Sequence, residues 1–261
     1  MSKNNEKLSN YSISQNFLTS RAVIERLLRK TTISRSDTVL EIGAGKGHIT
    51  RALAQQSGRV ISYEIDPALY ARLQPQLPKN VTLYGSDFLK APLPPTSYKV
   101  FANIPFSRTS EIIRKLTTGT ALPEGIWLIL EKGAAKRFCG LSCENLNSLL
   151  LRPFFETKIV AHLHREDFHP APRVDTVLME FQKKEVPDIL PEQRKVYADF
   201  LAYHFRYGLW SSRSLLTRKQ IATALKQEGL PKIKPSDTML YVQWLCLFRC
   251  WVRYGKPLPR R

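Results

Sequence analysis

The sequence has 261 residues, 43% of them hydrophobic, which is enough for one substantial core and a second, smaller unit. Its 40 Lys and Arg against 22 Asp and Glu give a formal net charge of +18, which favours a polyanionic partner; a merely soluble basic surface is the alternative. An anionic membrane surface is a further option, but the sequence has no run of 18 apolar residues that could span a bilayer as a helix. The first residues resemble neither a signal peptide nor a transit peptide, so we expect a cytoplasmic location.

Apolar runs alternate with amphipathic stretches through roughly the first 180 residues. The apolar runs TVLEIG, RVISYE, VTLYGS, YKVFAN and GIWLILE predict strands at 38–43, 59–64, 81–86, 98–103 and 125–131. Apolar residues recur with helical spacing at 21–30, 48–56, 67–77 and 110–118. This alternation predicts βαβ units around a parallel sheet. The stretches 158–165 and 174–182, which flank the proline-rich HPAPR, predict antiparallel strands at the sheet edge.

The periodicity becomes helical throughout after the charged stretch KKEVPDILP. Helices are predicted within 191–208, 214–228 and 237–254. Residues 184–261 carry 15 Lys and Arg against 6 Asp and Glu, a net charge of +9, and the much longer 1–183 also carries +9. We therefore predict an α/β catalytic domain at 1–183 and a small, basic, all-helical accessory domain at 184–261 that binds the polyanion.

A glycine-rich loop separates the first predicted strand of the sheet from a helix. In EIGAGKGHIT the glycines are Gly43, Gly45 and Gly47, whereas a dinucleotide-binding loop would also need a glycine where His48 stands. The G-x-G-x-G spacing instead matches the loop of S-adenosylmethionine-dependent methyltransferases. Glycines let the backbone approach the methionine part of this cofactor closely. A tight turn that binds no ligand is the alternative.

Acidic residues follow the next two strands. Glu64 ends ISYE about 20 residues after the glycine loop, and a carboxylate there can accept hydrogen bonds from both ribose hydroxyls of a nucleoside. Asp87 follows the third strand in GSDF and could accept a hydrogen bond from the adenine amine. Their neighbours Ile65 and Phe88 are assigned to the same cofactor site. Solvated strand ends are the alternative, but these features arrive in order at successive strand ends.

The fourth strand ends in NIPF. The Asn103 side-chain oxygen and the Ile104 carbonyl could accept both hydrogens of an exocyclic adenine amine and so orient a poorly nucleophilic nitrogen. Pro105 stiffens the turn, and Phe106 offers a face on which an unstacked base can lie. A buried core role is the alternative for Phe106. The sequence therefore predicts Asn103, Ile104, Pro105 and Phe106 as catalytic residues for methylation of an adenine amine.

Two clusters resemble metal sites but lack the required companions. The cysteines form two pairs with i,i+4 spacing, and three histidines lie in HLHREDFH. Neither arrangement has the ligand spacing of a zinc site, so we predict free thiols, a surface or RNA-facing histidine strand, and no metal.

Several motifs together resemble the ribosomal RNA adenine dimethyltransferase superfamily. They are SQNF (14–17), EIGAGKG (41–47), GSDF (85–88), NIPF (103–106) and FHPAPRVDTVL (168–178). NIPF with the following TSEIIRKL, together with EKGAAKRF and QWLCLF, is similar to the erythromycin-resistance (Erm) methyltransferases within it. The resemblance implies a Rossmann-like, S-adenosylmethionine-dependent methyltransferase domain. It adds Asn16 and Leu18, beside the glycine loop, to the cofactor contacts.

The resemblance to Erm enzymes implies transfer of methyl groups to N6 of one adenine in 23S rRNA and hence resistance to macrolide, lincosamide and streptogramin B antibiotics. It also implies a free or early precursor RNA as substrate, and we expect a monomer. Many relatives have tyrosine where Phe106 stands, so no hydroxyl is essential there. Two alternatives stay open: a small-subunit (16S-type) rRNA dimethyltransferase, against which the absence of the NLPY form argues, and a non-catalytic nucleic-acid-binding relative.

Overall fold

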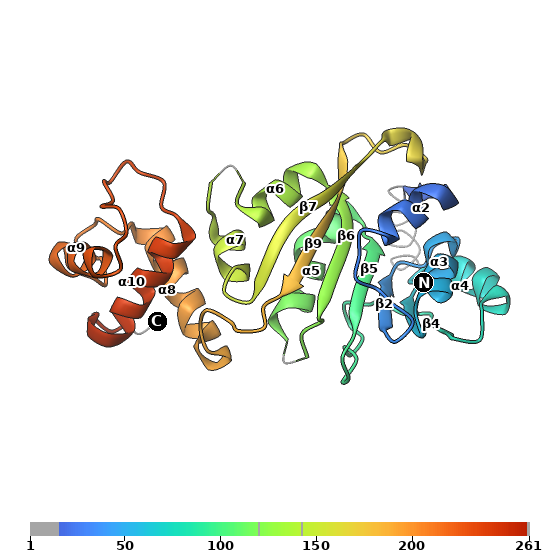
Figure 1. Ribbon diagram of the computed structural model, residues 1–261, viewed down its shortest axis with the longest axis horizontal. Coiled ribbons are helices and arrows are strands. Elements are labelled where there is room, and N and C mark those ends of the chain that lie inside the picture. Colours follow the sequence, from blue (N-terminus) through green and yellow to red (C-terminus); the bar gives the residue numbers. More distant parts are fainter. Residues whose placement is uncertain (1–15, 120, 142, 260–261) are drawn as a thin grey trace, which may run out of the picture. The chain divides into compact units, whose positions relative to one another are not determined.

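The computed structural model describes residues 16–119, 121–141 and 143–259, which form two compact units (Figure 1). The larger unit contains the residues up to Ala135 and Glu156–Lys183, and the smaller contains Lys136–Phe155 and Lys184–Arg261. The sequence places 136–155 in the catalytic domain, whereas their contacts group them with the C-terminal helices. The segment 1–15, for which the sequence predicts no signal peptide, lies outside the described residues.

A seven-stranded sheet runs through the larger unit in the order β4-β3-β2-β5-β6-β9-β7. Its strands are β2 (Thr38–Ile42), β3 (Arg59–Tyr63), β4 (Val81–Tyr84), β5 (Lys99–Asn103), β6 (Gly125–Glu131), β7 (Phe155–Leu163) and β9 (Thr176–Lys183). The first five pair in parallel, and β9 pairs antiparallel to β6. The predicted α/β class with a parallel sheet and antiparallel strands is therefore confirmed.

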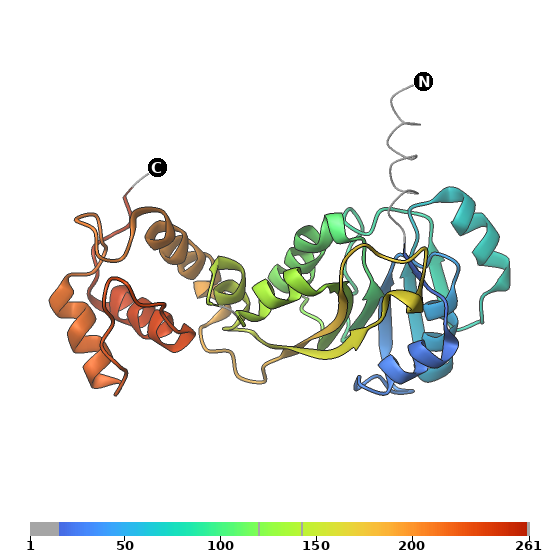
Figure 2. The ribbon, with the colours of Figure 1, turned by 90° about the horizontal axis from the view of Figure 1, so that it is seen from above.

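Helices cover both faces of this sheet. They are α2 (Arg21–Leu28), α3 (His48–Gln56), α4 (Pro67–Leu73), α5 (Thr109–Thr118) and α6 (Lys132–Cys139). The crossovers through α3 and through α5 leave the sheet centre in opposite directions, so right-handed connections put these helices on opposite faces (Figure 2). Buried residues of α2 and α3 pack with Val39, Phe101 and Trp127, each 0% exposed, in one core. Between β2 and β5 the strand order reverses, which is where α/β sheets bind ligands.

A side-chain cap fixes the start of α4, just after the strand end that carries Glu64. Asp66 Oδ1 accepts hydrogen bonds from Ala68 N (2.8 Å) and Leu69 N (3.2 Å), and Pro67 occupies the first turn, where it needs no donor. The chain therefore turns sharply between β3 and α4, which holds Glu64 at the sheet edge.

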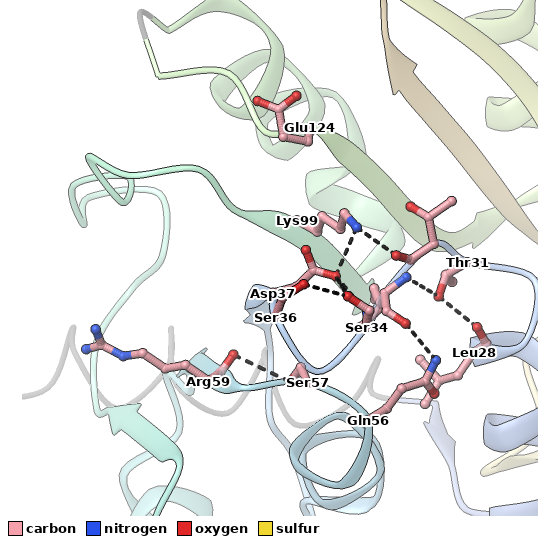
Figure 3. Close-up of polar contacts among 12 residues, drawn as sticks. Leu28, Thr31, Ser34, Ser36, Asp37, Gln56, Ser57, Arg59, Lys99 and Glu124 are labelled. Atoms are coloured by element: carbon pink, nitrogen blue, oxygen red, sulfur yellow. Dashed lines mark hydrogen bonds and ion pairs between the residues drawn. The ribbon is translucent and has the colours of Figure 1, made fainter.

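An ion pair fastens the opposite edge of the sheet, at the amino ends of β2 and β5 (Figure 3). Lys99 Nζ donates to Asp37 Oδ2 (2.9 Å) and to the Thr32 carbonyl (2.6 Å). Burial alone would raise the pKa of Asp37, but the hydrogen bonds from Lys99 and Ser34 outweigh it and lower that pKa. Because this cluster lies at the other end of the strands from NIPF, we assign it a structural role.

The smaller unit is helical, as the sequence predicts. Its helices are α7 (Leu146–Leu151), α8 (Arg194–Tyr207), α9 (Arg218–Gln227) and α10 (Tyr241–Tyr254). An aromatic core joins α8 to α10: the Phe200 ring stacks on Trp251 with centroids 5.2 Å apart and lies 5.7 Å from Phe248. The Tyr241 hydroxyl donates to Asp188 Oδ2 at 2.6 Å. These contacts give the unit a core of its own.

Within the described ranges, no helix is long and apolar enough to cross a membrane, and no group of three His, Cys, Asp or Glu residues is arranged to hold a metal ion. All four cysteines are free thiols. Cys139 and Cys246 are buried, Cys250 is half-buried and Cys143 is exposed.

Candidate active site

A cavity of about 450 Å³ opens in the larger unit at the carboxyl ends of β2, β3 and β5. This is the edge at which parallel sheets bring successive loops together. Eleven of the twelve site residues predicted from the sequence line it: Asn16, Gly43, Gly45, Glu64, Ile65, Asp87, Phe88, Asn103, Ile104, Pro105 and Phe106. The structure therefore gathers the glycine loop, both acidic strand ends and NIPF around one space.

The backbone of the glycine loop adopts left-handed conformations that residues with a Cβ atom rarely adopt. Gly43 and Gly45 have φ values of +79° and +56°. A Cβ atom on Gly45 would lie 2.8 Å from the Phe17 ring, whereas one on Gly43 would meet no protein atom within 4 Å. The space above Gly43 is thus open to a ligand, and Phe17, with the Lys46 ammonium 5.0 Å from its ring centroid, closes the loop on one side.

Glu64 ties the glycine loop to the end of β3. Its side chain is buried, with Oε2 accepting a hydrogen bond from Gly45 N (2.7 Å) and Oε1 from Asp66 N (2.8 Å). Burial raises the pKa of Glu64, and these backbone hydrogen bonds oppose the rise. Each carboxylate oxygen has a second lone pair, so the group still has capacity for two hydroxyl donors.

The turn after β4 brings Asp87 and Phe88 to the cavity. Asp87 Oδ1 accepts a hydrogen bond from Leu89 N (2.9 Å), and within the described part of the chain no group donates to Oδ2. Phe88 is 4% exposed, and its ring meets Tyr63 edge-on with centroids 5.8 Å apart. Asp87 thus has an acceptor available beside an apolar wall, as a planar base with an exocyclic amine requires.

NIPF forms the other wall. At the end of β5, Asn103 Nδ2 donates to the Asn16 carbonyl at 2.7 Å, which commits the amide nitrogen and leaves Oδ1 as an acceptor. The Ile104 amide donates to the Ile129 carbonyl (3.3 Å), and Pro105 has a φ of −64°. Phe106 begins the short 3-10 helix η2 (Phe106–Arg108) and is half-buried, not part of the core. Its ring is therefore available to the cavity.

Leu18 is the predicted site residue that does not line the cavity. It belongs to β1 (Phe17–Leu18), which pairs antiparallel with β8 (Phe168–His169). Its side chain is 2% exposed and packs in the hydrophobic core. The side chain therefore anchors the strand that brings Phe17 and Asn16 to the cavity.

Sequence reasoning missed eight lining residues: Phe17, Ile42, Tyr63, Ser86, Leu89, Ser107, Arg108 and Ile112. Most of them are next to a predicted site residue in the sequence, so the neighbours of each motif could also have been predicted to line the cavity. Ile112 gave no signal, because an apolar residue of an amphipathic helix has the pattern of the core.

Glu41 is a second buried carboxyl group below the glycine loop. It is 1% exposed, and Oε2 accepts a hydrogen bond from the hydroxyl of Ser62, its partner across β2 and β3 (2.6 Å). Burial raises the pKa of Glu41 to about 7, although its hydroxyl hydrogen bonds oppose this; the nearby charge of Glu64 raises it further. Glu41 therefore titrates near neutral pH.

This raised pKa predicts a pH-dependent stability. The folded protein holds the Glu41 proton more tightly than the unfolded chain, so stability falls as the pH rises from the ordinary glutamate range to about 7. Glu41→Gln, which stays neutral, should unfold like the wild type at pH 5 and be more stable at pH 8, by on the order of 2–3 kcal/mol. Urea unfolding of both proteins across this range tests it; a constant difference at all pH values contradicts it.

The cavity fits the nucleoside cofactor that the sequence predicts. Three features follow three successive strands: the glycine loop, the buried Glu64 carboxylate with unused lone pairs, and the Asp87 acceptor beside an apolar wall. Nucleoside-binding α/β folds place the same kinds of group at these strand ends. With the G-x-G-x-G loop and no third dinucleotide glycine, the fold and site define an S-adenosylmethionine-dependent methyltransferase.

Comparisons with known proteins agree. The sequence profile of the family "Ribosomal RNA adenine dimethylase" matches residues 6–228. An rRNA adenine N-6-methyltransferase of Escherichia coli is 33% identical over 249 residues, covering 94% of this chain and 98% of the relative. One from Enterococcus faecalis is 32% identical with the same coverage. The chain belongs to the ribosomal RNA adenine dimethylase family and is an S-adenosylmethionine-dependent rRNA methyltransferase.

Two solved structures resemble the whole chain. The 23S rRNA methyltransferase ErmE is 25% identical with a TM-score of 0.76, covering 91% of this chain and 100% of that one. A dimethyladenosine transferase from Plasmodium falciparum, 22% identical with a TM-score of 0.64 and covering 88% of this chain and 86% of that one, shares the fold. The similarity to Erm enzymes inferred from NIPF and the neighbouring motifs is thus supported by structure as well as sequence.

Proposed function

We propose that this enzyme methylates the exocyclic N6 amine of one adenine in 23S rRNA and thereby confers resistance to macrolide, lincosamide and streptogramin B antibiotics. The observation that carries the proposal is the match along nearly the whole chain to ErmE, a 23S rRNA methyltransferase. The relatives named rRNA adenine N-6-methyltransferases support the choice of the adenine amine.

The cofactor supplies a methyl group already activated on a positively charged sulfur. The chain's part is to hold it: the glycine loop and Asn16 take the methionine end, and Glu64 accepts from the ribose hydroxyls. Asp87 accepts from the adenine amine, while Ile65 and Phe88 provide apolar contacts to the nucleoside. The hydrogen bonds from Gly45 N and Asp66 N support this by fixing the Glu64 carboxylate before any ligand arrives.

The target base needs orientation more than activation. Asn103 Oδ1 and the Ile104 carbonyl accept the two amine hydrogens and turn the nitrogen lone pair towards the reacting methyl carbon. The Asn16 carbonyl fixes the Asn103 amide in the required orientation through its 2.7 Å hydrogen bond. Phe106 stacks on the base after it has left its RNA neighbours, on a turn stiffened by Pro105.

The helical unit serves as the RNA-binding accessory domain. Residues 184–261 carry a net charge of +9, and phosphate contacts release counterions. Residues 136–155, which fold with this unit, add Lys136, Arg137 and Arg152 against Glu144, with which Arg152 forms an ion pair (3.0 Å). We expect a cytoplasmic monomer that acts on free or early precursor 23S rRNA.

One experiment tests the choice of substrate. The protein is incubated with labelled S-adenosylmethionine and purified 23S or 16S rRNA, and dimethylated adenines are located by primer-extension stops. We expect label in 23S rRNA at one adenine and macrolide resistance in a susceptible host that expresses the gene. Label confined to 16S rRNA would establish the small-subunit dimethyltransferase instead, and no label in either RNA would favour the non-catalytic relative.

Substitutions of Phe106 test whether its ring stacks on the target base or only stabilises the fold. Phe106→Ala should lower methyl transfer about fivefold to a hundredfold, the equivalent of about 1–3 kcal/mol of base stacking. Melting temperature and calorimetric affinity for S-adenosylhomocysteine should change little, because the ring is half-buried. Phe106→Tyr, which keeps the flat ring, should retain most activity. Full activity of the alanine variant, or a loss that follows its unfolding, would refute the stacking role.

A further inference from the structure

Lys115 of α5 is a cation that the proposed mechanism does not use. Its ammonium donates to the Phe88 carbonyl at 2.6 Å and to the Ala91 carbonyl, and it lies 4.7 Å from the centroid of the Phe88 ring. Burial lowers the pKa of Lys115, and the negative charge of Asp87 opposes this only in part. The lysine is therefore half-buried and directed at the main chain beside the cavity, unlike the solvated lysines of a general basic surface.

The segment that Lys115 contacts is a short turn outside the helices and strands. Lys90 N donates to the Asp87 carbonyl (3.0 Å) and Ala91 N to the Phe88 carbonyl (3.1 Å), so the turn is closed on itself. Among the described residues, Lys115 provides the hydrogen bonds that join this turn to another element of the fold. The turn carries three residues of the cavity wall, Asp87, Phe88 and Leu89.

The lysine comes from the helix that faces the other wall. Helix α5 follows η2, which begins at Phe106, and one turn before Lys115 it carries Ile112, which lines the cavity. The ammonium thus fixes the distance between the Asp87 turn and the helix behind NIPF. A substitution of Lys115 should affect the cavity by altering the position of the Asp87–Leu89 turn, because Lys115 does not itself line the cavity.

We propose that Lys115 is a positioning residue that sets selectivity for the nucleobase of the cofactor, by holding the Asp87–Leu89 turn so that Asp87 faces the 6-amino group. This rests on the proposed role of Asp87. The Phe88 carbonyl has a second lone pair beside the one that accepts from Ala91 N, and the Ala91 carbonyl also accepts from Lys115; a charged donor holds both carbonyls more firmly than water does. Without it, the Asp87 carboxylate samples more orientations and no longer distinguishes an amine from a carbonyl at the same ring position.

The test compares two ligands that differ at that position, S-adenosylhomocysteine and S-inosylhomocysteine, in which oxygen replaces the 6-amino group. The wild type should bind the adenosyl compound at least about tenfold more tightly, because an acceptor that faces oxygen is left unpaired. In Lys115→Met the calorimetric affinity for the adenosyl compound should fall about tenfold and that for the inosyl compound should barely change, so the ratio of dissociation constants approaches one.

Three further variants complete the experiment. Lys115→Arg, whose guanidinium can still donate to both carbonyls, should restore most of the ratio. Lys90→Met removes the same charge from an exposed position on the same turn and should leave it unchanged. Should Lys115→Met fail to fold, Lys115→Gln, a neutral donor, should give an intermediate ratio.

A ratio that persists in the Met or Gln variant, or an equal loss of affinity for both ligands, overturns the role of Lys115. A wild type that binds the two ligands equally overturns the assignment of Asp87 and this proposal with it. Methylation of 23S rRNA by the wild type is measured separately, so the target assignment stands or falls by its own result.

Discussion

Gly45→Val is expected to reduce affinity for S-adenosylmethionine about a hundredfold or more, because overpacking and backbone strain each cost about 1–3 kcal/mol. Gly45 has a φ of +56°, and its Cβ would lie 2.8 Å from the Phe17 ring. The valine must displace either the ring or the loop, and its amide would then lose the hydrogen bond to Glu64 that holds the loop against β3. Calorimetry with S-adenosylmethionine measures the effect, and S-adenosylhomocysteine, which lacks the methyl group, should show a similar loss.

Two control variants distinguish a steric clash with the ligand from the effect of backbone strain at positive φ. Gly43→Ala also places a side chain at positive φ but meets no protein atom within 4 Å, so a loss of affinity beyond the cost of backbone strain reports contact with the ligand. Gly229→Ala has a φ of +65° in the helical unit and should lower stability without changing cofactor affinity. Unchanged affinity in a folded Gly45→Val protein would remove the glycine loop from the cofactor site.

Asn103→Ala is expected to lower kcat about a hundredfold to a thousandfold, the usual cost of losing a group that positions the reacting atom. Its Oδ1 is the proposed acceptor for the target amine, and its Nδ2 hydrogen bond to the Asn16 carbonyl holds that oxygen in place. The affinity for rRNA should fall little, because phosphate contacts supply most of it. Single-turnover methylation of 23S rRNA, beside filter binding of the same RNA, separates the two quantities.

The matched control is Ser86→Ala, which removes a hydroxyl from the opposite wall of the same cavity. It should keep nearly full activity. A similar loss in both variants would mean that any polar change in the cavity is damaging, and equal activity of Asn103→Ala and the wild type would refute the positioning role.

Much of the site was predictable because parallel strands end at one edge of the sheet. Glu64, Asp87 and Asn103 lie far apart in the chain, yet each lies at or shortly after the end of a strand of the same sheet, so their common location follows from the strand pattern alone. The antiparallel strands β7 and β9 were predictable for a related reason, since proline-rich residues between two apolar runs exclude a helical crossover.

The remaining features depend on long-range packing, which no local pattern records. The pairing of β1 with β8 determines where Phe17 lies, and two residues are too few to show a strand period. The raised pKa of Glu41 comes from burial that β2 acquires only inside the sheet. The grouping of 136–155 with the C-terminal helices likewise crosses the boundary that composition indicates, because charge density reports on surfaces and not on which core a helix joins.

The pairing of β1 with β8 also means that the active site cannot be completed until residues 168–169 have been synthesised. Phe17 is opposite His169, so the strand that carries the cavity residue Phe17 and follows Asn16 gains its partner only after most of the larger unit has left the ribosome. Until then Asn103 has its own strand but no fixed carbonyl to hold its amide. Because the same strand also carries Phe17 against the glycine loop, a nascent chain completes the cavity and the support for Asn103 in one late step, after β8 has been made.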